Sequence, residues 1–132
     1  MGFECWIDQT QIVNLTQITD TLNINCDVAC NPGKHVLKFI IKNKQQHHTQ
    51  IDLHGKIIKD SYLTISQVSM DDFEIDQKLT DNAIYEHNFN NTGPLVKKQF
   101  YQDVGCNGTV VLEFSTPIYE WLSDTYHIVK RY

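Results

Sequence analysis

Apolar residues recur at every second position along several stretches of this chain. The pattern is clearest in residues 21–28, where one side would carry Leu22, Ile24, Cys26 and Val28 and the other polar residues. A period of two indicates a strand with one buried and one solvated face. Asn31-Pro32-Gly33 follows as a turn and ends this predicted strand.

The same alternation predicts further strands at 34–43, 49–53, 56–59, 61–69, 73–75, 83–89 and 108–115. Residues 34–43 place Leu37, Phe39 and Ile41 on one face, which favours a strand in the middle of a sheet. In 108–115 the inward set is Val110, Leu112 and Phe114. His54-Gly55 and Asp71-Asp72 supply turns between the segments.

Helical signals are confined to two short segments, at about 94–102 and 117–124. In the first, Pro94 could open a helix whose apolar side includes Leu95 and Phe100. In the second, Thr116 is expected as the N-cap and Pro117 at the first helical position. Ile118, Trp121 and Leu122 then share one helix face.

These elements predict one all-β domain over residues 1–132, an antiparallel β-sandwich or jelly roll with one or two short helices. Frequent turns, little helix and no alternation of strands with helices favour that class. A chain of 132 residues buries roughly two thirds of its unfolded surface. It therefore needs no metal or disulfide to fold.

Composition and charge limit the classes of partner that this chain can bind. Hydrophobic residues make up 41% and charged residues 20%, and 11 basic against 16 acidic residues give a net charge of −5. A phosphate backbone would be repelled, so nucleic acid is not an expected partner. No apolar run approaches the roughly 20 residues that cross a bilayer. The first ten residues lack a secretion signal, which predicts assembly in the cytoplasm.

Cysteine and histidine offer two candidate metal sets. Cys26, Cys30 and His35 could be a fragment of a zinc site, but a second ligand pair is missing, and Cys26 also fits a core position of a strand. Without a signal peptide, reduced thiols are the default, although disulfides and metal binding stay open.

A second set could be drawn from His47, His48, Asp52 and His54. An exposed polar hairpin explains these residues as well. His87 alternates with Tyr85 and Phe89 and is expected to be half-buried and hydrogen-bonded.

No catalytic constellation is visible. The chain has no Gly-x-Ser-x-Gly elbow, no His-Glu-x-x-His and no phosphate loop, since Gly105-Cys106-Asn107-Gly108 is followed by a strand rather than by a Lys and a helix. We expect no enzymatic activity and no cofactor.

Aromatic residues fall mostly in strand patterns, so Trp6 and Trp121 are expected in the core. An alternative is a flat face for sugar rings or for a protein partner. The candidates for that face are Tyr62, Tyr85, Tyr101, Tyr119 and Tyr126.

Residues 60–65 with Val68 and Met70-Asp71-Asp72 resemble the strand and turn of calcium-dependent xylan-binding carbohydrate modules. That family implies a jelly roll whose loops hold calcium and sugar. The Gly-rich calcium loops of the family are missing here, so no calcium or sugar ligand carries over to a residue of this chain.

A longer stretch, from about 35 to 122, is similar to small uncharacterised proteins of tailed bacteriophages, especially those of marine and cyanobacterial hosts. The similar pieces are 35–39, Lys59-Asp60, 85–90, 105–110 and 116–122. The resemblance implies a virion β-sandwich, such as a capsid decoration, neck, tail or baseplate component. Such a protein would contact other virion proteins, as a homo-oligomer or within a larger assembly. The alternative is a module that binds host surface glycans, with or without calcium.

Overall fold

The computed structural model describes residues 1–45 and 48–126. The elements in chain order are β1 (Gly2–Ile7), β2 (Thr10–Leu15), β3 (Gly33–Lys42), β4 (Thr49–Ile51), β5 (Ile57–Asp60), β6 (Leu63–Thr64), β7 (Ser69–Met70), β8 (Phe73–Glu74), α1 (Asp76–Asn82), β9 (Ile84–His87), β10 (Val96–Gln99), β11 (Asp103–Val104), β12 (Gly108–Thr116) and α2 (Ile118–Tyr126).

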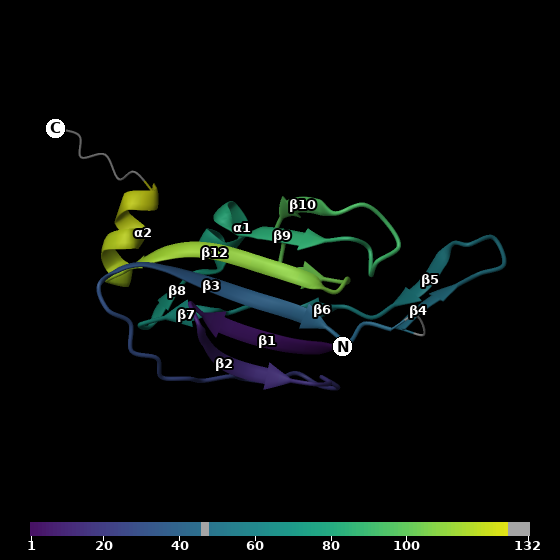
Figure 1. Ribbon diagram of the computed structural model, residues 1–132, viewed down its shortest axis with the longest axis horizontal. Helices are drawn as coiled ribbons and strands as arrows, with labels where there is room; N and C mark the ends of the chain where they lie inside the picture. The colour runs from purple at the N-terminus through teal and green to yellow at the C-terminus, as the bar shows by residue number, and fades with distance from the viewer. Residues whose placement is uncertain (46–47, 127–132) are drawn as a thin grey trace.

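One six-stranded antiparallel sheet organises the molecule, in the order β10-β9-β12-β3-β1-β2 (Figure 1). At its centre β3 and β12 pair from Gly33↔Thr116 to Ile41↔Gly108. Both strands were predicted, and both carry apolar residues on alternate positions. Three two-stranded sheets accompany the large one: β11-β6, β4-β5 and β7-β8.

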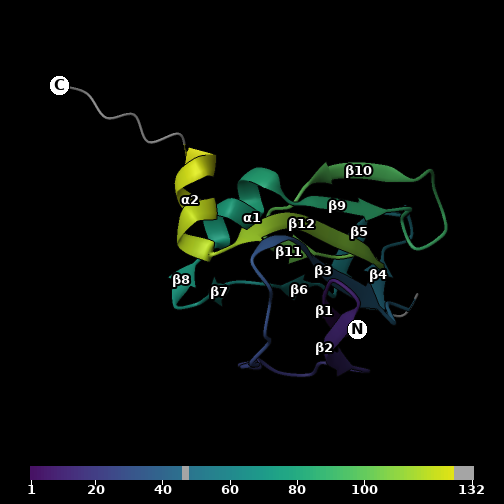
Figure 2. The same ribbon diagram turned by 60° about the vertical axis from the view of Figure 1, so that its left-hand side comes forward.

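One face of the large sheet is buried. Leu37 lies opposite Leu112, and Phe39 lies opposite Val110, with all four side chains in the core. The second layer that covers this face comes from α1, α2 and the short strands β6, β7, β8 and β11 (Figure 2). It contributes Ile75, Leu79, Phe100, Val104, Ile118 and Trp121 to a single buried cluster. The predicted all-β, antiparallel, sandwich-like class is confirmed.

The predicted helix at 94–102 is wrong. Its central residues form β10, which pairs with β9 through Val96↔His87 and Gln99↔Ile84. Phe100 is fully buried, and its backbone N–H donates to the Ala83 carbonyl at 3.2 Å. β9 has one unpaired side, and the four residues of β10 form backbone hydrogen bonds along it. This tertiary pairing outweighs the weak local preference of the segment for a helix.

The predicted strand at 21–28 is also wrong, since residues 17–31 form no strand and no helix. The chain only bends at Asp20. Cys26 is exposed rather than part of a strand core. Alternation alone does not make a strand, because the backbone needs a neighbour with which to pair.

Four elements were missed: β1, β2, α1 and the two-residue strand β11. β1 and β2 were not predicted although Phe3, Cys5 and Ile7 alternate, and Asp8 takes a left-handed conformation (φ 52°) in the turn between them. Helix α1 was missed as well. Its signal was Ile75, Leu79 and Ala83 at i, i+4 and i+8, all of them buried.

The terminal helix is confirmed as α2, with a different start. Thr116 is the last residue of β12, and its hydroxyl donates to the Asn31 carbonyl at 2.8 Å instead of capping the helix. The Pro117 carbonyl accepts the N–H groups of Glu120 and Trp121 at 3.2 and 3.3 Å. The other predicted strands are present but shorter in several places: 61–69 yields only β6 and the first residue of β7.

Replacing Leu112 by Ala should lower the free energy of unfolding by about 3 kcal/mol, because a leucine buried at the sheet centre leaves a cavity that rigid neighbours cannot fill. Urea denaturation measures the change. Leu53→Ala is the control: Leu53 is 102% exposed, and its loss should cost less than about 0.5 kcal/mol. Equal losses for the two variants would contradict the assignment of the core.

Candidate functional site

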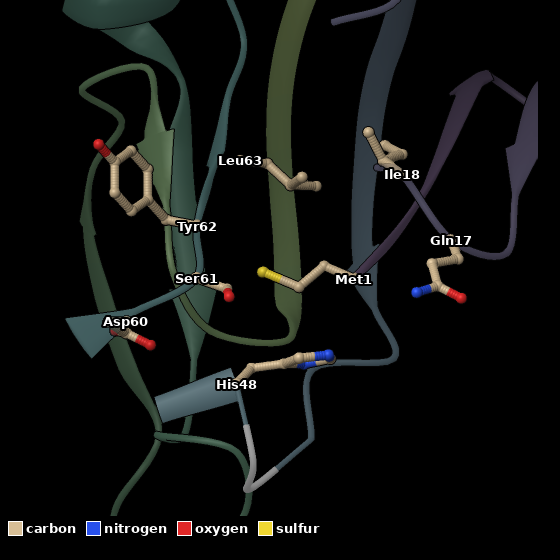
Figure 3. Close-up of a pocket in the computed structure, with 8 residues that line it drawn as sticks. All are labelled: Met1, Gln17, Ile18, His48, Asp60, Ser61, Tyr62 and Leu63. Carbon is tan, nitrogen blue, oxygen red and sulfur yellow. The ribbon is translucent and has the colours of Figure 1, made fainter. Parts of the chain in front are cut away.

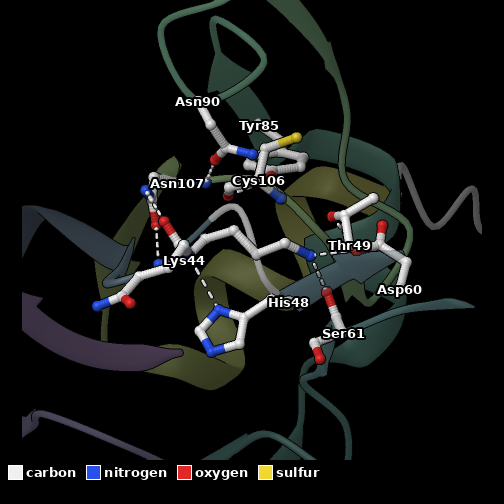
Figure 4. Close-up of polar contacts among 10 residues, drawn as sticks. Lys44, His48, Thr49, Asp60, Ser61, Tyr85, Asn90, Cys106 and Asn107 are labelled. Carbon is white, nitrogen blue, oxygen red and sulfur yellow. Dashed lines mark hydrogen bonds and ion pairs between the residues drawn. The ribbon is translucent and has the colours of Figure 1, made fainter. Parts of the chain in front are cut away.

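A buried lysine closes one end of the large sheet. Lys44 lies just after β3, and its side chain is 2% exposed. Its Nζ donates to the Asp60 carboxylate and to the Ser61 carbonyl (Figure 4). A cation withdrawn from water in this way is stable only with such partners.

Asn107 binds the backbone of the same residue. Its Oδ1 accepts the Lys44 N–H at 2.8 Å, and its Nδ2 donates to the Lys44 carbonyl at 3.2 Å. Its own N–H donates to Asn90 Oδ1 at 2.8 Å. A side-chain amide thus continues the pairing beyond the ends of β3 and β12 and attaches the loop between β9 and β10.

Tyr85 belongs to this network and not to a binding surface. Its hydroxyl donates to the Cys106 carbonyl at 2.6 Å and accepts the Cys106 N–H at 3.0 Å. The side chain is 2% exposed. Burial raises the pKa of Tyr85 to about 12, so the hydroxyl stays protonated. The prediction of Tyr85 as an exposed contact residue is wrong, because its place in β9 turns it toward the core.

Asp60 connects the network with the surface. Burial raises the pKa of its carboxyl, but hydrogen bonds from Lys44, Thr49 and the Ser61 backbone, with the Lys44 charge, outweigh burial and leave the pKa below the ordinary value of 3.8. Because the folded-state pKa is depressed, Asp60 stabilises the fold above pH 3.8, and this contribution is lost as the pH falls through the lower folded-state pKa.

An open depression of about 370 Å³ lies beside Asp60 (Figure 3). Its lining residues are Met1, Gln17, Ile18, His48, Asp60, Ser61, Tyr62 and Leu63. Tyr62 is 61% exposed and lines the depression together with the Asp60 carboxylate, the Gln17 amide and the His48 imidazole. Its ring points away from Gln17 and His48, which lie on the other sides of the depression (Figure 3). A predicted surface tyrosine therefore adjoins a depression at this place.

The other predicted tyrosines are scattered over the fold. Tyr101 follows β10 and its hydroxyl donates to Gln99 Oε1 at 2.8 Å, while Tyr119 lies in α2. Both are exposed. Among the described residues no ring contact joins Tyr62, Tyr101 and Tyr119, and the side chain of Tyr126 lies outside the described set.

The two candidate metal sets do not come together. Asp52 Oδ1 accepts the N–H groups of His54 and Lys56 at 2.8 and 2.9 Å, so it shapes the turn between β4 and β5. His48 Nδ1 accepts the Gln45 N–H at 2.9 Å, and His47 lies outside the described residues. Among the side chains that the structure describes, no group of three His, Cys, Asp or Glu residues could hold a metal ion.

The cysteines and His35 have other roles. All four cysteines are free thiols. His35 Nδ1 lies 2.6 Å from Asp8 Oδ2, and its Nε2 lies 2.6 Å from the Asn31 carbonyl. The hydrogen bond with Asp8, then that with Asn31, raises the pKa of His35 above 6.5. A protonated ring donates at both nitrogens and so joins the turn after β1 to the chain before β3.

His87 is buried more deeply than expected. It lies between the rings of Tyr85 and Phe89, with centroids 4.8 and 4.7 Å away, and its Nδ1 accepts the Phe89 N–H at 3.2 Å. Burial, with a smaller effect of the Lys98 charge, lowers the pKa of His87. The ring is a satisfied core residue, as the alternation in β9 indicated.

The second face of the large sheet carries a surface that the sequence did not reveal. Trp6 lies here and not in the core: its Nε1 donates to Glu4 Oε1 at 3.0 Å, and Lys38 Nζ lies 5.8 Å from its ring centroid. We call this the outer face, defined by the half-buried or exposed side chains of Glu4, Trp6, Val36, Lys38, Ile40, Lys42, Ile84, Glu86, Thr109, Val111 and Glu113. The phase of β1, with Phe3 and Cys5 on the other side, would have located Trp6.

Comparison of the chain with protein-family models, with curated proteins and with solved structures finds no match. Within the described residues, no helix is both long and apolar enough to span a bilayer. Function therefore has to be argued from the surfaces of this chain.

Lys44→Met should lower the free energy of unfolding by about 2 kcal/mol, because it removes the charged donor that Asp60 and the Ser61 carbonyl share. The cost is limited because Asp60 is 37% exposed and can be hydrated. Lys44→Met combined with Asp60→Asn should recover part of the loss. Chemical denaturation of the three proteins measures this, and an unchanged stability of Lys44→Met would contradict a structural role for the pair.

Proposed function

We propose that the chain is a non-catalytic component of a phage particle and acts through contacts with other particle proteins. The observation that carries the proposal is the outer face of the large sheet. The second layer packs against the opposite face, and no side chain of the outer face is buried.

The chemistry of the outer face fits a protein partner. Half-buried Trp6, Ile40 and Val111 share it with exposed Val36 and Ile84. It carries both signs of charge, with lysines on β3 and glutamates on β1, β9 and β12, and Lys42 Nζ lies 3.1 Å from Glu4 Oε2. Mixed apolar, aromatic and paired charged groups are typical of protein interfaces. A face that spans β9, β12, β3 and β1 suits a neighbouring protein better than a small ligand, which binds in an enclosed cleft.

The proposal that this chain is part of a phage particle rests on the resemblance of residues 35–122 to small proteins of tailed phages. A decoration, neck, tail or baseplate component of this kind works by burying such a surface against its neighbours. The short edges of the sheet add backbone groups that a neighbouring strand can pair with.

Mass spectrometry of purified particles, produced from the genome that encodes this chain, should find it at a fixed copy number. Ile84→Lys should reduce that copy number at least about tenfold, because a charge on the outer face has to be desolvated on docking. Thermal unfolding of the variant should be unchanged. Leu53→Lys is the control, since Leu53 is also an exposed aliphatic residue but lies on the β4–β5 turn, away from the outer face. Particles that lack the wild-type chain would refute the proposal.

Glycan binding is a second candidate function, supported by the depression beside Tyr62. An exposed ring stacks on the apolar face of a sugar, and the Asp60 carboxylate and Gln17 amide supply hydrogen-bonding groups. The depression is open to solvent, so binding would be weak and would depend on the ring.

If this second function holds, a neutral oligosaccharide should raise the melting temperature of the wild-type protein, because a ligand bound only to the folded state stabilises it. The shift should vanish in Tyr62→Ala and persist in Tyr119→Ala, whose ring is also exposed but lies in α2. A screen of glycans, with and without calcium, measures it. A melting temperature unchanged throughout the screen removes this candidate.

A further inference from the structure

The segment between β2 and β3 has the sequence of a strand but no strand partner. We call residues 19–30 the strap. Leu22, Ile24, Cys26 and Val28 alternate with polar residues in it, yet Leu22 and Ile24 are 51% and 46% exposed. Irregular segments of this length are uncommon in compact domains and are usually functional.

The two ends of the strap are fixed. The Ile18 N–H donates to the Met1 carbonyl at 2.8 Å, and the Asn31 carbonyl receives His35 Nε2 and the Thr116 hydroxyl. Between these points, the hydrogen bonds of the described chain include no backbone–backbone bond from the strap. The strap is thus held at a defined place while its own backbone groups stay available.

That place is the β2 edge of the large sheet. The strap passes around the β2 side of the sheet on its way to β3 (Figure 1 and Figure 2), and Cys26 Sγ lies 4.0 Å from the Ile12 carbonyl. β2 has one neighbour, β1, so its other side is unpaired.

The two edges of the sheet differ in charge. β10, at the far edge, carries Lys97 and Lys98, and such charges are a common protection against pairing with another chain. β2 (TQIVNL) carries no charge at all, and the strap carries only Asp20 and Asp27. The β2 edge therefore lacks the electrostatic protection that the β10 edge has.

We propose that a second copy of this chain docks at the β2 edge, with the straps of the two copies paired antiparallel across a two-fold axis and each strap lying against its own β2. This inference rests on the proposed assembly role and names one of its partners. The two large sheets become one continuous sheet through the paired straps.

The strap sequence is complementary to itself in one register. With Asn25 on the two-fold axis, Leu22 lies opposite Val28 and Ile24 lies opposite Cys26, so the apolar residues of both copies share one face. Asp27 lies opposite Asn23 and not opposite another acidic residue. A closed two-fold interface of this kind is the commonest form of self-association.

The apolar row of the strap also extends the buried face of the sheet. Cys5 and Val13 lie opposite each other in β1 and β2 and pack against the core. Burial raises the pKa of the Cys5 thiol to about 11, and the nearby Cys26 thiol adds to this shift. Cys26 thus lies near the inward-facing row, and pairing would bury the four apolar side chains of each strap.

Sedimentation equilibrium of the full chain over a wide range of concentration tests the proposal. The wild-type protein should dimerise, and Leu22→Asp with Ile24→Asp should raise the dissociation constant at least about a hundredfold, because four charges enter the apolar row. The matched control is Ile51→Asp with Leu53→Asp, the same residue types and charge change at exposed positions on β4 and its turn. A monomeric wild type, or equal effects of the two double variants, would overturn the proposal.

A cysteine placed on the two-fold axis tests the register. In a Cys26→Ser background, Asn25→Cys should form a covalent dimer on mild oxidation, since residues on the axis have a Cα–Cα distance of about 5 Å, within disulfide range. Asn23→Cys, opposite Asp27, should not, and the background alone controls for the remaining thiols. A dimer that fails to cross-link at residue 25 would overturn the proposed pairing.

Because particle content is measured separately, a dimer missing from particles refutes the assembly role, while a monomer found in particles refutes only the strap interface.

Discussion

The pairing of β3 with β12 is the constraint on which the rest of this structure depends. These two strands hold the middle of the large sheet, and the opposed pairs Leu37–Leu112 and Phe39–Val110 make its inner face apolar. That face has to be covered, and the chain covers it with two short helices and fragments of strand instead of a second full sheet. All of this covering material lies on one side, so the outer face keeps Trp6 and its neighbours accessible.

A polar, fully hydrogen-bonded network lies at one end of the same two strands, in contrast to the apolar inner face. Lys44 and Asn107 continue the pairing where β3 and β12 end, and Asp60 and Tyr85 complete the set. No buried side-chain nitrogen or oxygen in the described part of the chain lacks a hydrogen-bond partner. A network that is satisfied in this way rigidifies a fold. The lowered pKa of Asp60 follows from these hydrogen bonds and the Lys44 charge, and the raised pKa of Tyr85 follows from burial. Both causes are structural, so the two shifts do not by themselves indicate catalysis.

Much of the fold could be predicted from local alternation, and the failures share one physical cause. Residues 34–43 and 108–115 form strands because each finds the other, whereas 21–28 has an equally regular pattern and finds no backbone partner. The prediction for residues 94–102 is wrong for the opposite reason: the segment does find a strand partner, β9, and the local sequence gives no sign of it. The site was less predictable: Lys44 and Asp60 are far apart in sequence, so only the folded chain brings them together. Tyr62 was a candidate for a binding face, but the depression beside it depends on residues from the chain's first segments.

The contrast between the two sheet edges explains where new contacts can form. A strand edge is a row of unpaired donors and acceptors, and a protein either blocks it or uses it. At β10 the neighbouring lysines oppose the approach of another strand, while at β2 neither charge nor proline does so. The strap adds half-exposed apolar side chains beside that open edge, and exposing them to water costs free energy that a neighbouring strand would recover. The alternation at residues 21–28 does not form a strand within one copy. It is the pattern expected of a strand whose pairing partner is the strap of a second copy.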